Sequence, residues 1–223
     1  MAASRNRPLL LGHRGARAVS SLRENSFDSF DRALADGCDG FEFDVRLTAD
    51  GTAVVCHDPA VGGIEIARTL PESFPQLPRL EDVLSRYHDR AFLDIELKVA
   101  GAELTTSALL KRLAPARGFV LSSFLPQILE SLHRIDSNLL LGLICETRAQ
   151  LQRWRQLPIS FVIAHFRLVD RCLVEQLTAE KKKSFVWTVN SAASMRKFTE
   201  LGVDGIISDR TALLARTLGK WGI

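Results

Sequence analysis

Three carboxylates interrupt strongly apolar runs in this chain: Glu42, Asp44 and Glu96. An unpaired charge in such a run costs several kcal/mol to bury, so these acids need a partner. Carboxylate oxygens are the ligands that Mg²⁺ and Ca²⁺ prefer in proteins. The sequence therefore predicts that the three acids bind one divalent cation, either Mg²⁺ or Ca²⁺. A purely structural ion pair, such as Glu42 with Arg14, is the alternative.

Two histidines and two basic residues accompany the acids. His13 directly precedes Arg14, Lys98 lies two residues after Glu96, and His57 ends a short apolar run. An imidazole exchanges a proton near neutral pH, and Arg and Lys can hold a phosphate. We therefore predict acid–base roles for His13 and His57 and phosphate contacts for Arg14 and Lys98. Either histidine could instead be a turn residue, but the glycine at position 15 suggests backbone that closely approaches a ligand.

Other residues at predicted strand ends carry weaker signals. Trp187 is either a core residue or an aromatic wall of a ligand pocket. The role of Asp94 depends on its depth, which the sequence does not give. The remaining polar residues are expected to lie in the core, at a rim or at helix caps: Ser122, Ser123, His165 and Asp209.

Short runs rich in Val, Ile, Leu and Phe alternate with helical patterns along most of the chain. The predicted strands are Leu9–Gly12, Phe41–Val45, Phe92–Leu97, Phe119–Ser122, Leu139–Ile144, Phe161–Ala164, Phe185–Val189 and Gly205–Ser208. The predicted helices are Glu24–Ala35, Glu81–Tyr87, Glu103–Leu113, Pro126–Ile135, Arg148–Trp154, Leu173–Ala179, Ala192–Leu201 and Thr211–Leu218.

This alternation predicts an α/β fold, a single-domain (β/α)8 TIM barrel over residues 1–223. The polar residues above follow strands, where the active site of such a barrel lies. A doubly wound open sheet is the alternative, but it usually has a glycine-rich phosphate loop after its first strand. The segment Gly12-His13-Arg14-Gly15 does not have the G-x-G-x-x-G pattern.

One extra apolar run, Ala53–His57, follows the second barrel strand without a helix between them. Asp50-Gly51 is a strong hairpin signal, so we predict a short β-hairpin here. A two-residue turn would place Asp44 opposite His57 and give both side chains the same face. A short loop insertion follows at about 59–79, which the sequence predicts to be irregular.

The composition is that of a soluble globular protein. The chain has 223 residues, of which 46% are hydrophobic and 25% charged, and its net charge of +3 gives no reason to expect a nucleic-acid partner. None of its four cysteines forms a C-x-x-C pair, and we see no signal peptide and no integral membrane segment. We expect a cytoplasmic protein, and the oligomeric state stays open.

The motifs together resemble one known family, the glycerophosphodiester phosphodiesterases. The matching segments are Gly12–Gly15, Glu24–Ser26, Gly40–Val45, Thr48–Gly51, His57-Asp58, Ile95–Lys98, Trp187–Asn190 and Gly202–Asp209. Each segment is a weak signal alone, but all of them in family order over residues 12 to 209 are specific.

The resemblance implies a barrel that hydrolyses a glycerophosphodiester, its small-molecule substrate, to an alcohol and sn-glycerol 3-phosphate. It also implies a metal at Glu42, Asp44 and Glu96, and acid–base catalysis by the two histidines. Arg14 and Lys98 match phosphate and substrate contacts of the family, and Trp187 matches a substrate-facing aromatic. The insertion after His57 is short for the family, which leaves the choice of head group open.

Two other functions stay open. The same barrel could act on lysophospholipids or phosphoinositides, for which the Val61–Leu70 loop with Ile64 and Ile66 could supply an apolar rim. A non-catalytic binding barrel is the alternative from another class, but such a protein should have lost a metal ligand or a histidine.

Overall fold

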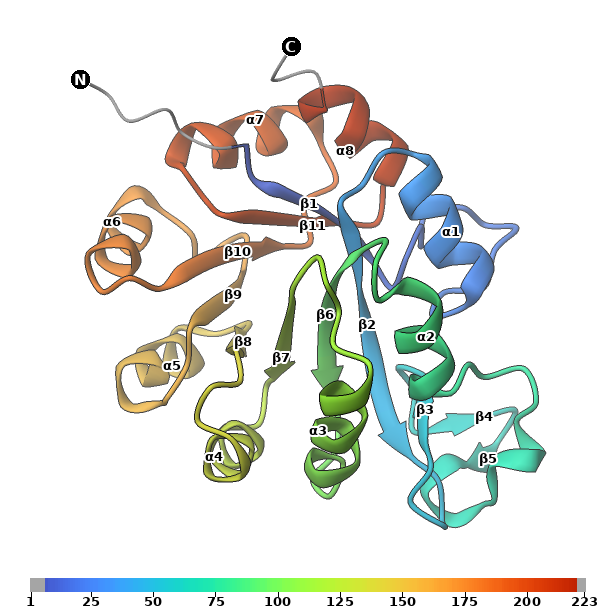
Figure 1. The fold of residues 1–223 in the computed structure, drawn as a ribbon. Coiled ribbons are helices and arrows are strands. Elements are labelled where there is room, and N and C mark those ends of the chain that lie inside the picture. Colours follow the sequence, from blue (N-terminus) through green and yellow to red (C-terminus); the bar gives the residue numbers. More distant parts are fainter. Residues whose placement is uncertain (1–6, 220–223) are drawn as a thin grey trace.

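The computed structural model describes residues 7–219, and residues 1–6 and 220–223 lie outside that description. Within the described residues, eight parallel strands form a barrel surrounded by helices (Figure 1). The barrel strands are β1 (Leu9–His13), β2 (Gly40–Leu47), β6 (Phe92–Leu97), β7 (Phe119–Ser123), β8 (Leu141–Cys145), β9 (Phe161–His165), β10 (Lys183–Trp187) and β11 (Gly205–Ser208).

The barrel is closed because its first strand has a partner on each side. Leu11 of β1 is paired with Ile207 of β11 and with Gly40 of β2, both in parallel. An open doubly wound sheet would leave two unpaired edges, so that alternative is wrong and the predicted (β/α)8 barrel is confirmed.

The helices follow the predicted pattern. They are α1 (Phe27–Ala35), α2 (Leu80–Tyr87), α3 (Glu103–Arg112), α4 (Pro126–Ile135), α5 (Arg148–Leu151), α6 (Arg171–Ala179), α7 (Ala192–Leu201) and α8 (Thr211–Leu218). The first helix begins three residues later than predicted because Ser26 caps it, with its hydroxyl accepting a hydrogen bond from the Ser29 amide. The fifth is shorter than predicted and continues as the 3-10 helix η3 (Gln152–Gln156).

Apolar side chains fill the barrel below its carboxyl-terminal end. The rings of Phe92, Phe161 and Phe185 meet there, with centroids 5.1 Å apart for Phe161 and Phe185 and 5.9 Å apart for Phe92 and Phe185. These rings form a packed core that closes the inside of the barrel. The only opening for a ligand in this part of the described barrel is therefore at the carboxyl ends of the strands, which we call the mouth.

The predicted hairpin is present, but its predicted register is wrong by one residue. After β2 the chain turns into β3 (Ala53–Val55), which pairs with β2 in antiparallel fashion. The Cys56 amide donates to the Asp44 carbonyl at 2.9 Å, so Cys56 rather than His57 is the neighbour of Asp44 on the ladder. His57 therefore approaches the mouth from the bend that follows β3.

The turn explains this shift. The Thr48 amide donates to the Thr52 carbonyl at 3.0 Å, which leaves a loop of three residues instead of two. Gly51 ends that loop with φ of 83°, the left-handed conformation that a three-residue hairpin loop needs at this place. The Asp50-Gly51 pair predicted the hairpin correctly and its loop length incorrectly.

The insertion after His57 is more regular than predicted. It contains the two-stranded ribbon β4 (Ala60–Val61) and β5 (Ile64–Glu65), then the 3-10 turns η1 (Ile66–Arg68) and η2 (Pro71–Ser73). Ile66 and Phe74 are buried against Val54 of the hairpin, so a small separate core holds the insertion in place. Ile66 therefore adds nothing to an apolar rim, contrary to the expectation above, whereas Ile64 is exposed.

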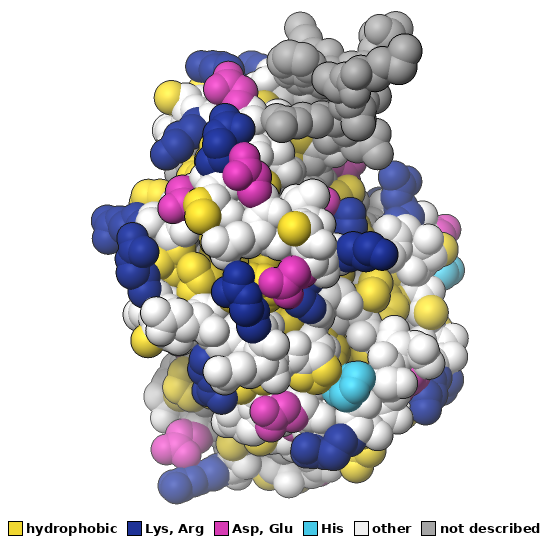
Figure 2. Space-filling view, turned by 90° about the vertical axis from the view of Figure 1, so that its left-hand side faces the viewer, with side chains coloured by type: hydrophobic (Ala, Val, Ile, Leu, Met, Phe, Trp, Pro, Cys, Tyr) yellow, Lys and Arg dark blue, Asp and Glu magenta, His cyan; other side chains and the backbone are white. Residues whose placement is uncertain are grey.

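On the surface drawn in Figure 2, Lys and Arg side chains are interspersed with Asp, Glu and uncharged side chains and do not form one continuous basic area. No helix within residues 7–219 has the length and apolarity that crossing a bilayer requires.

Candidate active site

The first part of the site is the turn that carries His13 and Arg14 out of β1. Arg14 has φ of 51° and Gly15 has φ of 81°, so the chain turns sharply through two left-handed residues. A Cβ on Gly15 would lie 2.4 Å from the Ser29 hydroxyl, and that hydroxyl donates to the Arg14 carbonyl at 3.0 Å. The glycine therefore lets the turn pack on α1. The expectation that the backbone here approaches a ligand stays a prediction.

The three predicted metal ligands lie together on adjacent strands. β2 and β6 pair with Asp44 beside Glu96, which brings these residues to one level of the barrel. One oxygen each from Glu42, Asp44 and Glu96 lies within 4.8 Å of the others. All three side chains are buried. Glu42 and Glu96 line the cavity at the mouth together with Asp94.

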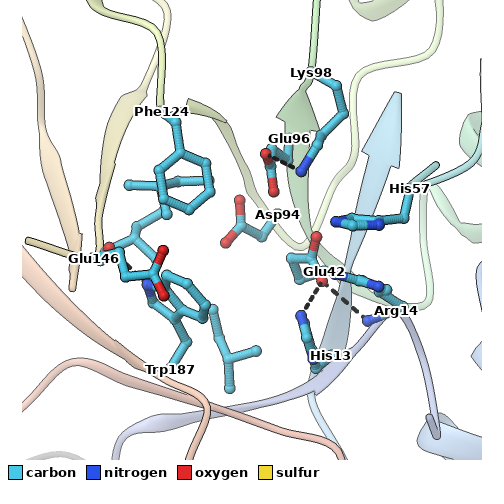
Figure 3. A pocket seen from close by; sticks show the side chains of 13 residues that line it. His13, Arg14, Glu42, His57, Asp94, Glu96, Lys98, Phe124, Glu146 and Trp187 are labelled. Atoms are coloured by element: carbon cyan, nitrogen blue, oxygen red, sulfur yellow. Dashed lines mark hydrogen bonds and ion pairs between the residues drawn. The ribbon is translucent and has the colours of Figure 1, made fainter. Parts of the chain in front are cut away.

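Both predicted basic residues contact this cluster. Lys98 Nζ lies 2.7 Å from Glu96 Oε1 and 3.3 Å from Asp44 Oδ1. Arg14 Nε lies 3.2 Å from Asp44 Oδ2, and its Nη1 donates to Glu24 Oε1 at 2.8 Å. Arg14 and Lys98 are thus held over the acids by ion pairs, with their charge at the cavity wall (Figure 3).

The acids differ in their pKa values. Burial raises the pKa of Glu42 well above its ordinary value, and the Asp44 and Glu96 carboxylates raise it further. The pKa of Glu96 rises to about 7, first because of burial and then because of the Asp44 charge. Burial would also raise the pKa of Asp44, but Lys98 and Arg14 outweigh that effect and bring it below the ordinary value.

These features fit a divalent cation. Four buried carboxylates, Glu42, Asp44, Asp94 and Glu96, are set against two basic side chains, so negative charge is in excess. Within the described part of the chain, Asp94 Oδ2 is buried without a hydrogen-bond partner. Burial raises the pKa of three of these carboxyl groups, and repulsion from neighbouring acids adds to the effect, so a cation bound here would favour their ionised forms.

His13 has a carboxylate partner that we did not predict. Its Nδ1 lies 2.7 Å from Asp209 Oδ1, and its Nε2 lies 3.8 Å from Glu42 Oε2. Burial would raise the pKa of Asp209, but the hydrogen bond and charge of His13 bring it down to about 2. An ionised Asp209 only accepts hydrogen bonds, so His13 carries its hydrogen on Nδ1 when neutral. The Nε2 atom is then free to exchange a proton on the cavity side.

Asp209 is itself held in place. Asn190 Nδ2 donates to Asp209 Oδ2 at 2.6 Å, and the Asp209 amide donates to Asn190 Oδ1 at 3.0 Å. Our expectation of a rim or cap role for Asp209 is therefore wrong. The pair of His13 and Asp209 could have been predicted from the register of a closed barrel. Gly12 and Ser208 are neighbours in that barrel, and His13 and Asp209 are the residues that follow them.

His57 lines the same cavity as His13 and has a similar partner. Its Nδ1 is 2.8 Å from Asp58 Oδ1, the carboxylate of the next residue. His57 is more exposed than His13, with 35% of its side chain accessible, and it lines the same cavity (Figure 3). The structure thus brings both predicted histidines to the acid cluster.

The opposite wall of the cavity is apolar. The cavity has a volume of about 310 Å³, and on this side it is lined by Phe124, Ile144, Glu146, Ile163, Trp187 and Ile207. The predicted residue Trp187 belongs to this wall, and its ring meets that of Phe124 edge to face at 5.7 Å. Phe124 and Glu146 were not predicted, although each follows a barrel strand directly.

Two serines and one histidine complete the comparison with the sequence. Ser122 and Ser123 are buried in β7 rather than at the rim, where Ser122 donates to Asp94 Oδ1 and Ser123 to the Leu97 carbonyl. His165 lies at the rim, as expected, with its ring against Phe166 and Trp187.

Asn25 is a further residue that we missed: its Nδ2 donates to Asp44 Oδ2 at 2.8 Å.

Comparisons with known proteins identify the class of this barrel. The sequence model of the glycerophosphoryl diester phosphodiesterase family matches residues 13–83 and 65–213. The chain belongs to this family, which confirms the resemblance seen in the sequence, and it is a phosphoric diester hydrolase.

Individual relatives cover almost the whole chain. A glycerophosphodiester phosphodiesterase of Caldanaerobacter subterraneus subsp. tengcongensis is 28% identical over 244 residues, covering 96% of this chain and 99% of its own. Another, of Bacillus altitudinis, is 25% identical over 231 residues and covers 90% of this chain and 94% of its own.

Solved structures share the fold. A phosphodiesterase of Oleispira antarctica, solved in complex with the product sn-glycerol-3-phosphate, superposes with a TM-score of 0.84. It is 23% identical and covers 96% of this chain and 98% of its own. A glycerophosphodiester phosphodiesterase of Thermotoga maritima has a TM-score of 0.81 at 23% identity, with coverage of 95% and 98%.

Proposed function

We propose that this protein hydrolyses glycerophosphodiesters to an alcohol and sn-glycerol 3-phosphate with the help of a divalent cation, and that residues 1–223 act as one domain. One observation carries the proposal. Two histidines, each with an acid at Nδ1, line one cavity of a phosphodiesterase barrel together with Glu42 and Glu96. One oxygen each from these two acids and from Asp44 lies within 4.8 Å of the others. The product bound to the Oleispira antarctica relative and the names of the sequence relatives support the substrate class.

Glu42, Asp44 and Glu96 would hold the cation. When bound, Mg²⁺ or Ca²⁺ neutralises negative charge on a phosphate oxygen, which lowers the cost of adding further negative charge at phosphorus. The described acids suit either ion, because all their ligand atoms are carboxylate oxygens. Arg14 and Lys98 add positive charge at the cavity wall and bind the phosphodiester anion there.

The two histidines transfer the protons. Asp209 fixes the hydrogen of His13 on Nδ1, which leaves Nε2 to take or give a proton, and Asp58 does the same for His57. One imidazole removes a proton from the attacking oxygen, and the other protonates the leaving alcohol. The attacking oxygen belongs either to water or to the 2-hydroxyl of the substrate's own glycerol. In the second case a cyclic phosphate forms as the alcohol leaves, and water then opens the ring to give sn-glycerol 3-phosphate, with the two histidines exchanging their roles. Each group contributes roughly 10² to 10⁴ in rate.

The test measures glycerol 3-phosphate released from a panel of glycerophosphodiesters, with chelator and then with added Mg²⁺ or Ca²⁺. We expect release that depends on the cation and falls at least 10²-fold in His57→Ala. His88→Ala is the matched control, because His88 is exposed at the carboxyl-terminal cap of α2, outside the cavity. Unchanged turnover in folded His57→Ala would exclude the acid–base role of His57.

A lipid diester is the second candidate substrate. Ile64 and Leu70 in the insertion are exposed apolar side chains, and such residues favour contact with an acyl chain or a membrane surface. Faster hydrolysis of lysophosphatidylcholine than of glycerophosphocholine would support this candidate against the first one.

A further inference from the structure

Arg17 lies in the loop after β1 and contacts two carboxylates behind the cavity without lining the cavity itself. Its Nε donates to Glu24 Oε2 at 2.7 Å, and its Nη1 lies 3.4 Å from Asp209 Oδ1. Glu24 belongs to the same loop as Arg17, whereas Asp209 follows the last barrel strand. Arg17 therefore links the loops that follow the first and the last strand of the closed barrel.

Each of these carboxylates also holds a residue that lines the cavity (Figure 3). Asp209 Oδ1 lies 2.7 Å from His13 Nδ1. Glu24 Oε1 accepts a hydrogen bond from Arg14 Nη1 at 2.8 Å. Glu24 thus uses one oxygen for Arg14 and the other for Arg17, so a shift of its carboxylate would affect both guanidinium groups. Arg17 is therefore one contact removed from a predicted acid–base residue and from a predicted phosphate-binding residue.

The backbone beside Arg17 is fixed as well. The Ala18 amide donates to the Asp209 carbonyl at 3.0 Å, and the Ala16 amide donates to the Ser29 carbonyl at 3.0 Å. The Arg17 side chain therefore extends from an anchored loop, which reduces the conformational entropy lost when it makes two contacts. The planar guanidinium presents several nitrogens in a fixed arrangement, which suits it to reach two acids at once.

Arg32 of α1 shows what an ordinary ion pair on this surface looks like. Its side chain is 47% exposed, against 43% for Arg17, and its Nε lies 2.7 Å from Asp36 Oδ1. Asp36 in turn accepts a hydrogen bond from the Thr211 hydroxyl, and none of these three residues lines the cavity that contains His13. An isolated exposed pair of this kind contributes little. The two acids of Arg17 differ because each has a second partner in the cavity.

We propose that Arg17 is a positioning residue for the hydrolysis, which orients the His13 imidazole through Asp209 and the Arg14 guanidinium through Glu24. The inference rests on the proposed function and adds to it a residue outside the cavity. The two routes have different kinetic signatures. Poorer placement of His13 slows proton transfer and lowers kcat, whereas poorer placement of Arg14 weakens binding of the phosphodiester and raises KM.

The experiment is a double-mutant cycle between Arg17→Ala and Asp209→Asn, with kcat and KM measured on one glycerophosphodiester. In the wild-type background we expect Arg17→Ala to lower kcat about tenfold and to raise KM about threefold. In the Asp209→Asn background the further loss of kcat should be less than about twofold, because the route to His13 is already broken, while the rise in KM should persist.

Arg17→Lys separates bridging from charge. Lysine keeps the positive charge but has a single nitrogen, so it cannot contact both acids as a guanidinium does. We expect it to melt near the wild-type temperature and still to lose kcat about fivefold, a combination that a purely structural role of Arg17 would not produce. Arg32→Ala is the matched control for the loss of an exposed arginine, and its kcat and KM should stay within about twofold of the wild type.

Losses of kcat that multiply independently in the double mutant, or a wild-type kcat in Arg17→Lys, would overturn the route through Asp209. A KM that Arg17→Ala leaves unchanged would overturn the route through Glu24. Each of these results is obtained on an active wild-type enzyme and so leaves the proposed function intact. A wild-type protein that releases no glycerol 3-phosphate would instead overturn the proposed function itself.

Discussion

The two walls of the cavity differ in the kind of side chain that lines them: one carries buried charged groups and the other is mostly apolar. On the side of β1, β2 and β6, buried carboxylates lie close together and two of their pKa values reach about 7. On the side of β7 to β10, most of the lining side chains are apolar, and the indole of Trp187 already donates its hydrogen to the Ile163 carbonyl. In the first wall, buried carboxylates repel one another until a cation binds. The second wall is mostly apolar and carries no such repulsion.

This difference separates chemistry from recognition. Groups that must stabilise a transition state have to be held ready in the folded protein, even where their own mutual repulsion disfavours folding. Groups that only select an alcohol can be packed without such a cost. Changes on the charged wall should therefore alter kcat and stability strongly, whereas changes on the apolar wall should alter KM modestly.

The largest effect is expected for Glu42→Gln. Glutamine keeps an oxygen for the Arg14 amide, which donates to Glu42 Oε2 at 3.0 Å, but it removes one metal-binding charge. We expect kcat/KM to fall about 10³-fold at saturating cation. In chelator, loss of repulsion with Asp44 and Glu96 should raise the melting temperature by about 2–4 °C, equivalent to about 1 kcal/mol.

The matched control for this variant is Glu175→Gln. Glu175 is exposed on α6, and its removal changes the net charge by the same amount without touching the cavity. Neither activity nor melting temperature should change. A Glu42→Gln protein that melts below the wild type in chelator would show that the acids do not repel one another in the folded state.

A smaller loss is expected for Asp209→Asn. An asparagine can turn its amide hydrogens toward His13 Nδ1 and so favour the tautomer with its hydrogen on Nε2. We expect kcat to fall roughly 10²-fold with KM changed less than about threefold, because the imidazole would still be present but in the wrong state. Steady-state kinetics on one glycerophosphodiester measures both constants.

Asp204→Asn separates orientation of His13 from general loss of stability. Asp204 precedes β11 at the other end of the barrel, where its carboxylate accepts a hydrogen bond from the Ser184 amide at 2.9 Å. This variant should lose stability and keep its kcat. If Asp209→Asn loses no more kcat than Asp204→Asn, Asp209 does not position His13.

The charged wall should also make stability depend on pH. The pKa values of Asp94 and Glu96 are raised to about 7 in the folded protein, so it binds more protons than the unfolded chain between their ordinary values and pH 7. Stability is then fully present below about pH 4 to 4.5 and falls as pH rises toward 7. Asp209, with its pKa lowered to about 2, acts oppositely and loses stability only as pH falls from its ordinary range toward 2.

Urea unfolding in chelator should therefore give a free energy of unfolding about 1–3 kcal/mol larger at pH 5 than at pH 7.5. Added Mg²⁺ or Ca²⁺ should reduce this difference, because a bound cation favours the ionised acids. Asp94→Asn removes one of the two groups and should flatten the dependence. Equal stability at both pH values in chelator would contradict the raised pKa values.

The sequence predicted the charged wall better than the apolar one. Glu42, Asp44 and Glu96 stood out because charge inside an apolar strand is costly, and the barrel brings one oxygen of each within 4.8 Å of the others. The aromatic wall gives no such signal, since Phe124 next to a strand resembles any core residue. Glu146 is an ordinary polar residue of a loop until the fold sets it beside the cavity.

The predictions that the structure corrects failed because they depended on tertiary contacts that the sequence does not show. The hairpin register depended on whether the loop has two or three residues, and Asp50-Gly51 is compatible with both. The packing of Gly15 against Ser29 of the following helix likewise could not be read from the sequence. Strand and helix positions were predictable because periodicity is local, whereas these contacts depend on tertiary packing.

The smallest effect is expected for Trp187→Phe on the apolar wall. Phenylalanine keeps an aromatic ring near Phe124 but loses the hydrogen bond to the Ile163 carbonyl and part of the contact area. We expect KM for glycerophosphocholine to rise about threefold and kcat to stay within about twofold, since the ring takes no part in proton transfer. A drop in kcat as large as that of Asp209→Asn, with KM unchanged, would mean that this wall also serves the chemical step. The division between a charged catalytic wall and an apolar binding wall would then be wrong.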